Sequence, residues 1–217
     1  MRIRDKIKKP QRPVVAYEIL PPREKDGTLN SYAETISSLL SQTHIDAINI
    51  PEVHDEVGRG ERPVSNQERG EPRKFGMLLQ DIVGIEAIVN RVVVHMPLKK
   101  QMEWIEETYS QYEIDNLIIV GGESSKQQYP GPTVNESLEK ISQENRLRKK
   151  SILCGGICIP SRKKESKNLI RKSECGAEFF TTQVLCDSGN VIKMIKNYQE
   201  RCDEVNTFPR RILLSFA

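Results

Sequence analysis

The fold is decided by the segment Val14-Val15-Ala16-Tyr17-Glu18-Ile19-Leu20-Pro21-Pro22-Arg23. Its short apolar run predicts a buried strand over residues 14–20. The two prolines end that strand at once, because neither nitrogen can donate to a strand ladder. Glu18 is therefore expected near the carboxyl end of a first strand, where α/β proteins place their chemistry. A carboxylate in such a run is costly unless it is paired or functional, and the alternative is a surface-facing glutamate on a half-exposed strand.

Strands and helices alternate from this segment to the end of the chain. The predicted strands cover residues 14–20, 45–50, 87–95, 116–120, 151–159, 178–185 and 211–216. The predicted helices cover residues 29–40, 74–82, 98–111, 133–148, 165–175 and 191–205. Thr28, or Asn30 with Ser31, is expected to cap the first of these helices, and Gly176 to end the fifth. The polar segment 51–71 between the second strand and the helix after it is predicted to be a long loop, of a length that is common for active-site lids.

This alternation predicts a parallel sheet with right-handed crossovers. The strands are apolar on both faces, as a sheet or barrel covered by helices requires. Seven units without a break favour a (β/α)8 TIM barrel over an open flavodoxin-like sheet. Since a full barrel has eight strands and about 250 residues, we expect residues 1–217 to form a single barrel domain whose C-terminal strand and helices are missing.

The composition indicates a protein without a membrane anchor. Of its 217 residues 37% are hydrophobic and 6% aromatic, and the mean hydropathy is −0.53. No apolar run approaches the roughly 18 residues that span a bilayer. The start of the chain lacks the apolar middle of a signal peptide. We therefore expect a cytoplasmic location and no membrane partner.

Charge and cysteine usage make nucleic acid and metal poor candidates as ligands. The net charge is only +3. The basic stretches at 6–9, 146–150 and 162–164 lack interleaved aromatic residues, so solvated helix faces explain them as well as nucleic acid does. The five cysteines include no Cys-x-x-Cys pair, and the three histidines have no metal-ligand spacing. We expect reduced thiols, no metal and no nucleic-acid partner.

The carboxyl ends of the predicted strands carry a polar set of residues. A barrel brings such residues together at one mouth. The set consists of Glu18, Glu52 with His54, His95, Glu123, Ser161 with Arg162, and Gln183 with Asp187. Gln183 could hold the amide edge of a heterocycle, but a satisfied core glutamine is as plausible. His95 could equally be a core histidine or a ligand contact.

Three further patterns suggest ligand binding, each with an ordinary alternative. Gly121-Gly122 follows the fourth strand and would let a ligand approach the backbone closely, although a tight turn explains it equally well. Gly155-Gly156 inside the fifth strand suggests a bulge or a ligand's approach. Asn168, Arg171 and Lys172 share one face of the fifth helix. Such a set can clamp a pyrophosphate, but a solvated basic face is the more common reason for it.

Three of these segments resemble the methylenetetrahydrofolate reductase family. Tyr17-Glu18-Ile19-Leu20-Pro21-Pro22-Arg23 is similar to that family's Phe-Glu-Phe-Phe-Pro-Pro-Arg segment. The stretch from Gly176 to Gln183 resembles its Gly-Ala-Asp-x-x-x-Thr-Gln strand, and Asn168-Leu169-x-Arg171-Lys172 its Asn-Leu-x-Arg-Lys helix. His95 matches a histidine that ends the third strand. The resemblance runs in order along nearly the whole chain.

The resemblance implies a barrel that binds FAD and passes a hydride from a nicotinamide to 5,10-methylenetetrahydrofolate. Glu18 would then protonate the folate nitrogen, and Glu123 and Gln183 would contact the substrate. The implied cofactor-binding residues are His95, Gly122, Glu165, Asn168, Arg171 and Lys172. The cofactor carries the hydride chemistry, and the protein aligns it and supplies the proton. The implied partners are a tetrahydrofolate-type substrate and a nicotinamide or other electron donor, with a homo-oligomer or an electron-transfer partner as further options.

The sequence departs from the family at the fourth strand. Val120-Gly121-Gly122-Glu123 stands where the family has Leu-Arg-Gly-Asp, so a flavin-contacting arginine is replaced by Gly121. Glu123 can stand in for the aspartate, but its carboxylate is displaced by roughly an angstrom, which matters for catalytic alignment. Two alternatives to a flavin-dependent reductase follow: a flavin-free pterin-binding barrel that takes part in methyl transfer, and a non-catalytic barrel that acts as a partner subunit.

Overall fold

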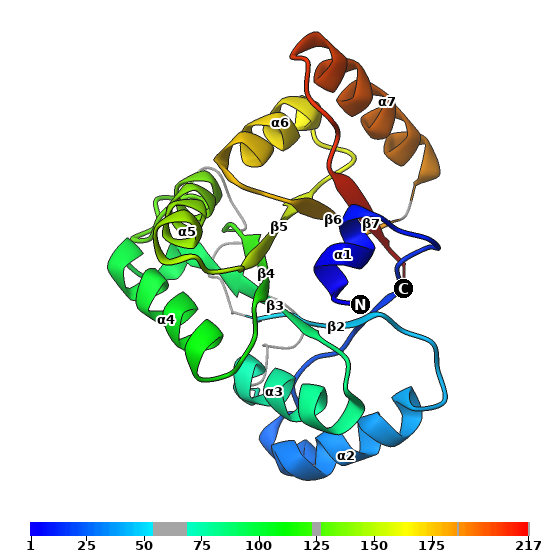
Figure 1. Ribbon diagram of the computed structural model, residues 1–217, viewed down its shortest axis with the longest axis vertical. Helices are drawn as coiled ribbons and strands as arrows, with labels where there is room; N and C mark the ends of the chain where they lie inside the picture. The colour runs from blue at the N-terminus through cyan, green and yellow to red at the C-terminus, as the bar shows by residue number, and fades with distance from the viewer. Residues whose placement is uncertain (54–68, 123–126, 186, 217) are drawn as a thin grey trace.

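The computed structural model describes residues 1–53, 69–122, 127–185 and 187–216. Its centre is a single parallel sheet in which every strand pairs with its neighbours in the sequence, in the order β1 to β7. The strands are β1 (Ala16–Glu18), β2 (Ala47–Ile50), β3 (Ala87–Val92), β4 (Asn116–Val120), β5 (Leu153–Cys158), β6 (Phe179–Val184) and β7 (Arg211–Ser215). The sheet curls into an incomplete barrel, and the predicted (β/α) barrel is confirmed (Figure 1).

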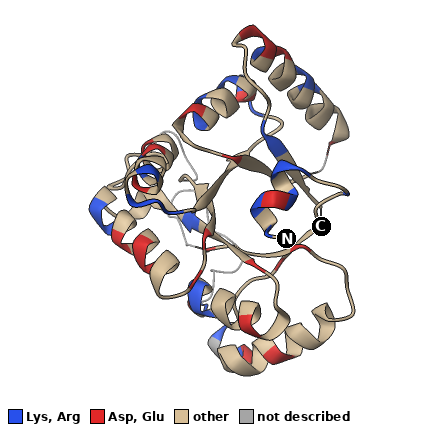
Figure 2. Ribbon diagram, viewed as in Figure 1, with Lys and Arg blue, Asp and Glu red and all other residues tan. Residues whose placement is uncertain are grey.

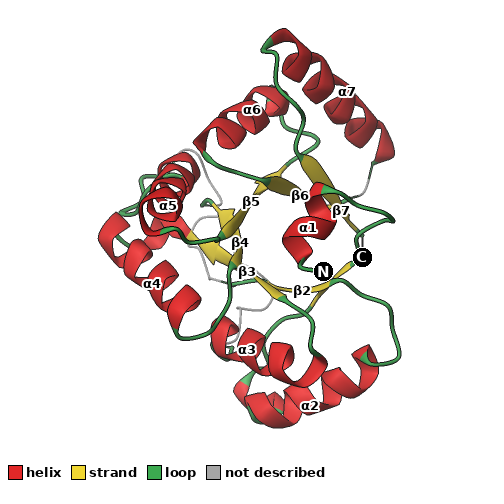
Figure 3. Ribbon diagram, viewed as in Figure 1, coloured by secondary structure: helices red, strands yellow, loops and turns green. Residues whose placement is uncertain are grey.

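Helices surround the curled sheet on its outer side, as the colouring by secondary structure makes clear (Figure 3). They are α2 (Leu29–Leu40), α3 (Pro72–Val83), α4 (Leu98–Ser110), α5 (Val134–Arg148), α6 (Glu165–Cys175) and α7 (Ser188–Glu204). Two predicted helix ends are confirmed. Thr28 caps α2 by accepting a hydrogen bond from the Ser31 N–H at 3.2 Å, and Gly176 ends α6 in a left-handed conformation.

Two apolar clusters lie on opposite faces of the sheet. The larger one packs between the sheet and the outer helices and includes Ile48, Val89 and Phe180. The smaller one fills the inside of the barrel and includes Ala47, Ile88 and Phe179. Because the two sets alternate along each strand, the clusters fix which residues point inward. The strands are thus apolar on both faces, as the sequence predicted.

Gly155 has a packing role inside this barrel. A Cβ atom at this position would collide with the ring of Phe179 on the neighbouring strand β6. The glycine therefore makes room for a fully buried phenyl ring. The sequence suggested a bulge or a ligand's approach for Gly155-Gly156, but β5 pairs regularly with β6 through both glycines and a protein side chain fills the space beside Gly155.

A short N-terminal helix, α1 (Ile3–Lys8), closes the amino end of the barrel (Figure 1). Ile3 and Ile7 are buried against the inner apolar cluster. The sequence pattern did not predict this helix, because six residues are too few to show a helical period and a helix this short is not stable without tertiary contacts. The burial of two isoleucines in the barrel supplies those contacts.

Ion pairs tie the N-terminal segment to the rim of the barrel. Four carboxylates each immediately precede a strand: Asp46 before β2, Glu86 before β3, Asp115 before β4 and Glu178 before β6. They pair with Arg2, Arg4, Lys6, Lys8 and Arg12. Most charged residues lie on the outer helices (Figure 2), whereas these N-terminal cations pair with carboxylates of the barrel. The basic stretch at 6–9, interpreted from sequence as a solvated face, therefore contributes Lys6 and Lys8 to this ring of ion pairs.

The ion pairs of Asp46 make the stability of the folded protein depend on pH. Burial by itself raises the pKa of Asp46, but hydrogen bonds from the Val15 N–H, Lys6 and Arg12 outweigh that effect and lower the pKa to about 2. A carboxylate whose pKa is depressed in the folded state stabilises the fold above its unfolded pKa and loses that contribution as the pH falls.

We expect Asp46→Asn to lower the free energy of unfolding by about 2 kcal/mol at pH 7, and by about half as much at pH 3. Urea denaturation at a series of pH values, followed by circular dichroism, measures this difference. Glu34→Gln, which alters an exposed carboxylate on α2, serves as the control. A cost for Asp46→Asn that stays constant down to pH 3 would contradict the role assigned to the Asp46 carboxylate.

Candidate functional site

The carboxyl ends of the strands form one mouth of the barrel, opposite α1 (Figure 1). On β2 and β3, Ala47 and Ile88 point inward, so Asn49 and Asn90, two residues further along, point inward as well. On β1, Ala16 packs against the same inner cluster, so Glu18 also faces the interior. Glu18 thus lies where the sequence predicted it, at the carboxyl end of the first strand.

Glu18 and Asn49 form a direct hydrogen bond at this mouth. The strand register places the two residues opposite each other, and Asn49 Nδ2 donates to Glu18 Oε2 at 2.7 Å. Glu18 itself is exposed, whereas Asn49 is only 9% exposed. The glutamate on a half-exposed strand was one of the two sequence interpretations, and the structure adds that its side chain is tied to a buried partner within the barrel.

Two buried amide oxygens lie on this inner surface without a hydrogen-bond partner among the described residues: Asn49 Oδ1 and Asn90 Oδ1. Asn90 is 8% exposed. A buried acceptor without a partner is unfavourable and calls for an explanation, such as a bound water or ligand. The sequence analysis missed both residues. Their signal is an asparagine inside an otherwise apolar strand, in Ala47-Ile48-Asn49-Ile50 and in Ile88-Val89-Asn90.

Glu52, which the sequence placed at the mouth, is bound into the wall of the barrel. Its carboxylate accepts from the guanidinium of Arg91 and from the Val92 N–H. Arg91 is 4% exposed, donates to Gln101 of α4 at 2.8 Å, and lies 4.3 Å from the centroid of the Trp104 ring. Burial lowers the pKa of Arg91, and the charge of Glu52 opposes that shift. Glu52 and Arg91 therefore stabilise the junction of β2, β3 and α4.

His95 and Gly122 are brought together by Tyr129. His95 lies in a short 3₁₀ turn (Val93–His95) after β3 rather than at the end of a strand. Its ring meets that of Tyr129 edge-on, with centroids 5.7 Å apart and an interplanar angle of 74°. A Cβ atom on Gly122 would collide with the Tyr129 ring. The space beside Gly122, where the sequence allowed a ligand's close approach, holds this tyrosine.

On α6, Glu165 organises the residues predicted to bind the cofactor. Glu165 is 3% exposed and accepts from the Ile159 N–H at 3.1 Å and from Asn168 Nδ2 at 2.9 Å. It also pairs with Arg162 at 3.2 Å, and Lys172 Nζ lies 3.8 Å from it. Lys172 donates to the Ile157 carbonyl at 2.5 Å.

These contacts revise the predicted pyrophosphate clamp. Asn168 and Lys172 face inward and share Glu165, while Arg171 is exposed. Burial lowers the pKa of Lys172, and the charge of Glu165 opposes that shift. The three side chains therefore do not present one common set of free donors, because helical periodicity fixes a face but not what the neighbouring strand places against it.

A small pocket opens beside the amino end of α6. It has a volume of about 260 Å³ and lies between the beginnings of α6 and α7. Four cations line it: Arg162, Lys163, Lys164 and Lys193. No side chain caps the amino end of α6, where Lys164 adopts a left-handed conformation. Exposed N–H groups at the start of a helix, together with lysine and arginine side chains, favour anions.

Two more of the predicted residues, Gln183 and Asp187, lie among the described residues. Gln183 is exposed near the carboxyl end of β6, within a register irregularity between Thr181 and Val184, so alternation along the strand does not define its direction. Asp187 caps α7 by accepting from the Gly189 N–H at 2.8 Å. Glu123 and His54 lie outside the described residues.

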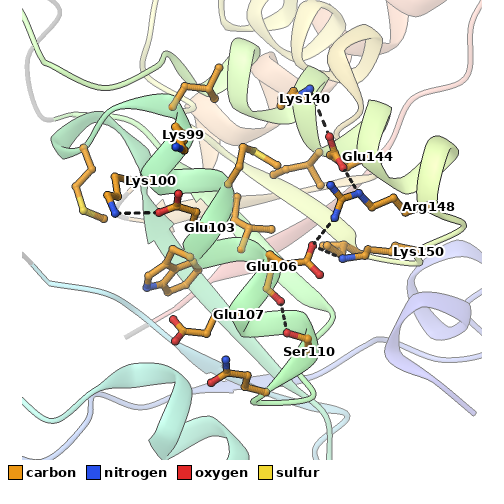
Figure 4. Close-up of a pocket in the computed structure, with 18 residues that line it drawn as sticks. Lys99, Lys100, Glu103, Glu106, Glu107, Ser110, Lys140, Glu144, Arg148 and Lys150 are labelled. Atoms are coloured by element: carbon orange, nitrogen blue, oxygen red, sulfur yellow. Dashed lines mark hydrogen bonds and ion pairs between the residues drawn. The ribbon is translucent and has the colours of Figure 1, made fainter.

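A larger cavity lies away from this mouth, on the outer surface between α4 and α5 (Figure 4). Its volume is about 870 Å³, and its floor includes Ile105, Ile141 and Ile152. An ion pair joins the two helices at its rim, where Arg148 of α5 lies 3.6 Å from Glu106 of α4. Size alone would make it the first candidate for a binding site, but it contains none of the predicted site residues. We place the candidate site at the mouth, where the polar side chains converge.

The part of the chain that the structure describes contains neither a cluster of potential metal ligands nor a helix able to span a membrane. No group of three or more histidine, cysteine, aspartate or glutamate side chains in residues 1–53, 69–122, 127–185 and 187–216 is arranged to hold a metal ion. Within the same ranges, no helix has both the length and the apolar character needed to cross a bilayer.

Comparison with known proteins identifies the fold. No family model and no curated protein matches the sequence. Among solved structures, an uncharacterised protein from Clostridium thermocellum that binds two copies of 5-methyl-5,6,7,8-tetrahydrofolic acid superposes with a TM-score of 0.75 at 18% identity. The match covers 98% of this chain and 68% of that one.

Two enzymes of other chemistry are also similar. A 2,3-dimethylmalate lyase of the PEP mutase/isocitrate lyase superfamily has a TM-score of 0.62 at 12% identity, over 99% of this chain and 80% of that chain. An oxaloacetate acetylhydrolase has a TM-score of 0.62 at 10% identity, over 100% and 79% of the two chains. At these identities the similarity establishes the TIM-barrel fold and leaves the chemistry to the site.

Proposed function

We propose that this protein binds a tetrahydrofolate-type pterin at the barrel mouth and reduces 5,10-methylenetetrahydrofolate to the 5-methyl form through FAD. The observation that carries this proposal is Glu18, held by Asn49 at the carboxyl end of β1, in the segment that resembles the reductase family. The similarity in fold to a protein that binds 5-methyl-tetrahydrofolic acid supports the choice of ligand.

The positive charges around the start of α6 match the negative charge of the FAD diphosphate. Arg171 is exposed, Arg162, Lys163 and Lys164 surround the uncapped start of the helix, and Asn168 lies on the first two turns. Cations and helix N–H groups are the donors that bind diphosphates. In this proposal Lys172 and Glu165 do not contact the diphosphate; they hold the start of α6 in place through their contacts with each other and with β5. His95, Gly122 and Tyr129 lie together beyond the ends of β3 and β4, and we propose that they contact the flavin from that side.

In the reaction, reduced FAD would supply the hydride. The protein's part is to hold the pterin against the mouth and to deliver a proton to the bridging folate nitrogen that leaves, as the methylene bridge opens to an iminium on the other nitrogen. Glu18 is suited to this step because it is exposed at the mouth, while its Oε2 atom is fixed by Asn49. Gln183 and Glu123 are proposed to contact the pterin, as the family resemblance implies.

The proposal extends to the protein's setting. A nicotinamide or another electron donor would reduce the flavin, in a cytoplasmic protein that works as a homo-oligomer or with an electron-transfer partner. The alternative is a flavin-free pterin-binding barrel that takes part in methyl transfer or acts as a partner subunit. One observation favours the alternative: Tyr129 packs against Gly122, and Asn168 donates to Glu165, so part of the predicted flavin site is occupied by the protein's own contacts.

Flavin uptake separates the two functions. We expect the purified chain to bind FAD, with the visible flavin bands and quenched fluorescence as readouts, and the reduced flavin to be reoxidised by methylenetetrahydrofolate. Lys163→Glu should weaken FAD binding by about tenfold or more, because it reverses a charge in the pocket proposed for the diphosphate. Arg146→Glu, an exposed charge reversal on α5, should change it less than about twofold.

Two other outcomes decide against parts of this proposal. A protein that takes up no FAD but binds 5-methyltetrahydrofolate supports the flavin-free barrel. A protein that binds neither compound rules out both functions.

A further inference from the structure

We infer that Asn49 is a positioning residue that fixes the Glu18 carboxyl group in the orientation needed for proton transfer. The role in proton transfer rests on the proposed function. The contact between Asn49 and Glu18 does not depend on the reaction. Asn49 Nδ2 donates to Glu18 Oε2 at 2.7 Å, and the β1–β2 register places the two residues directly opposite each other.

Glu18 needs such a partner because its own strand gives it little support. β1 has only three residues, and Glu18 is the last of them and is exposed. Among the described strand pairings, β1 pairs with β2 alone. A glutamate side chain in that position would sample several rotamers, and only some of them point toward a ligand at the mouth. Catalytic groups work best when neighbouring residues lock their rotamers.

Asn49 is itself held rigidly. It is 9% exposed and lies on β2, whose four residues are all buried. While Glu18 is ionised, the Asn49 amide can face its carboxylate in only one way, because turning Oδ1 toward Glu18 would place two acceptors against each other. With Nδ2 facing Glu18, Asn49 Oδ1 is left without a partner among the described residues. The hydrogen bond to Glu18 is therefore made at the expense of a buried oxygen without a partner. Such an unfavourable arrangement is typical of functional sites.

The contact also distinguishes the two carboxyl oxygens of Glu18. Oε2 accepts the Asn49 N–H, so the proton to be transferred is carried on Oε1. Deletion of the donor would leave the acid chemically intact but free to rotate. The expected signature is a slower proton-transfer step with little change in substrate binding, since Asn49 acts through Glu18.

The kinetic test uses Asn49→Leu, which keeps the number and branching of the side-chain heavy atoms and has no donor. We expect kcat for the reduction of methylenetetrahydrofolate to fall by about 10- to 100-fold, with KM changed less than about threefold. In the Glu18→Gln background the same change should have no further effect, because the group it positions is already gone. Additive losses in the double variant would overturn the inference.

Asn116→Leu is the matched control. Asn116 is 2% exposed and lies on β4 at the opposite end of the barrel, where it donates to the Ala87 carbonyl at 3.2 Å. Loss of this buried asparagine should lower stability without lowering kcat selectively. An equal loss of kcat in Asn49→Leu and Asn116→Leu would mean that Asn49 has only a structural role.

A second measurement keeps the test independent of the reaction and of the folding of Asn49→Leu. In uniformly ¹⁵N-labelled protein, the side-chain amide protons of Asn49 should shift when Glu18, an exposed residue, is replaced in Glu18→Ala. No shift would overturn the inference, whatever the enzymatic activity. A shift in a protein that reduces no folate would support the contact and reject the proposed function, so the two failures can be told apart.

Discussion

Replacement of Glu18 by glutamine is expected to lower the rate of methylenetetrahydrofolate reduction by about 10²- to 10⁴-fold, the range that general acids contribute. Glutamine has nearly the same shape and can still meet the Asn49 amide through its carbonyl oxygen. It has no acidic proton, however, so the folate nitrogen that leaves as the bridge opens would lose its proton donor. Reduction of the flavin by the electron donor requires no proton from this position and should stay within about twofold of its original rate.

Stopped-flow measurement of the two half-reactions tests this expectation. Flavin reduction is followed as the loss of the oxidised absorbance, and folate reduction as its return. Glu34→Gln, at an exposed position on α2, is the matched control and should alter neither half-reaction. Survival of both half-reactions in Glu18→Gln would exclude Glu18 as the acid and return it to the status of an ordinary strand residue.

The largest stability effect is expected at Phe179. This residue is completely buried in the barrel interior, where it packs with Ile3 and Ile7 of α1 and lies beside Gly155. Phe179→Ala would leave a cavity that the surrounding strands cannot collapse to fill, because they are fixed by pairing on both sides. Such changes cost about 3–5 kcal/mol.

Thermal and urea denaturation of Phe179→Ala and Phe208→Ala should differ accordingly. Phe208 is 89% exposed, so its removal should change the free energy of unfolding by less than about 0.5 kcal/mol. A small effect of Phe179→Ala would mean that the N-terminal helix and the barrel interior are not packed as one cluster. Because α1 depends on this cluster, residues 1–12 should also become sensitive to protease in Phe179→Ala.

Local sequence patterns predicted most of the outer architecture. Apolar runs and glycine, proline and threonine signals placed β4 (Asn116–Val120), α2 and α6 at their observed bounds. The first strand is shorter than the predicted 14–20, because only Ala16–Glu18 pairs with β2. The third strand ends at Val92, and His95 falls in the turn that follows it. Each difference arises because strand ends are set by the neighbouring strand and not by the apolar run itself.

In the candidate site, too, local sequence patterns predicted some features and tertiary contacts were needed for others. That Glu18 lies at a strand's carboxyl end follows from the prolines after it. Its partner Asn49 is 31 residues away, and its identity requires knowing that β1 and β2 are parallel neighbours in a particular register. On α6, periodicity grouped Asn168, Arg171 and Lys172, but the contacts with Glu165 and Ile157 separate them.

Apolar periodicity, proline and glycine act within a few residues, and they were enough to predict the alternation of strands and helices, the barrel that follows from it, and the end of the barrel on which Glu18 lies. Three features depend on long-range packing: α1 closes the opposite end, Glu165 draws Asn168 and Lys172 inward, and Asn49 holds Glu18. Those contacts join residues distant in sequence, so strand register and helix packing had to be known before any of them could be assigned.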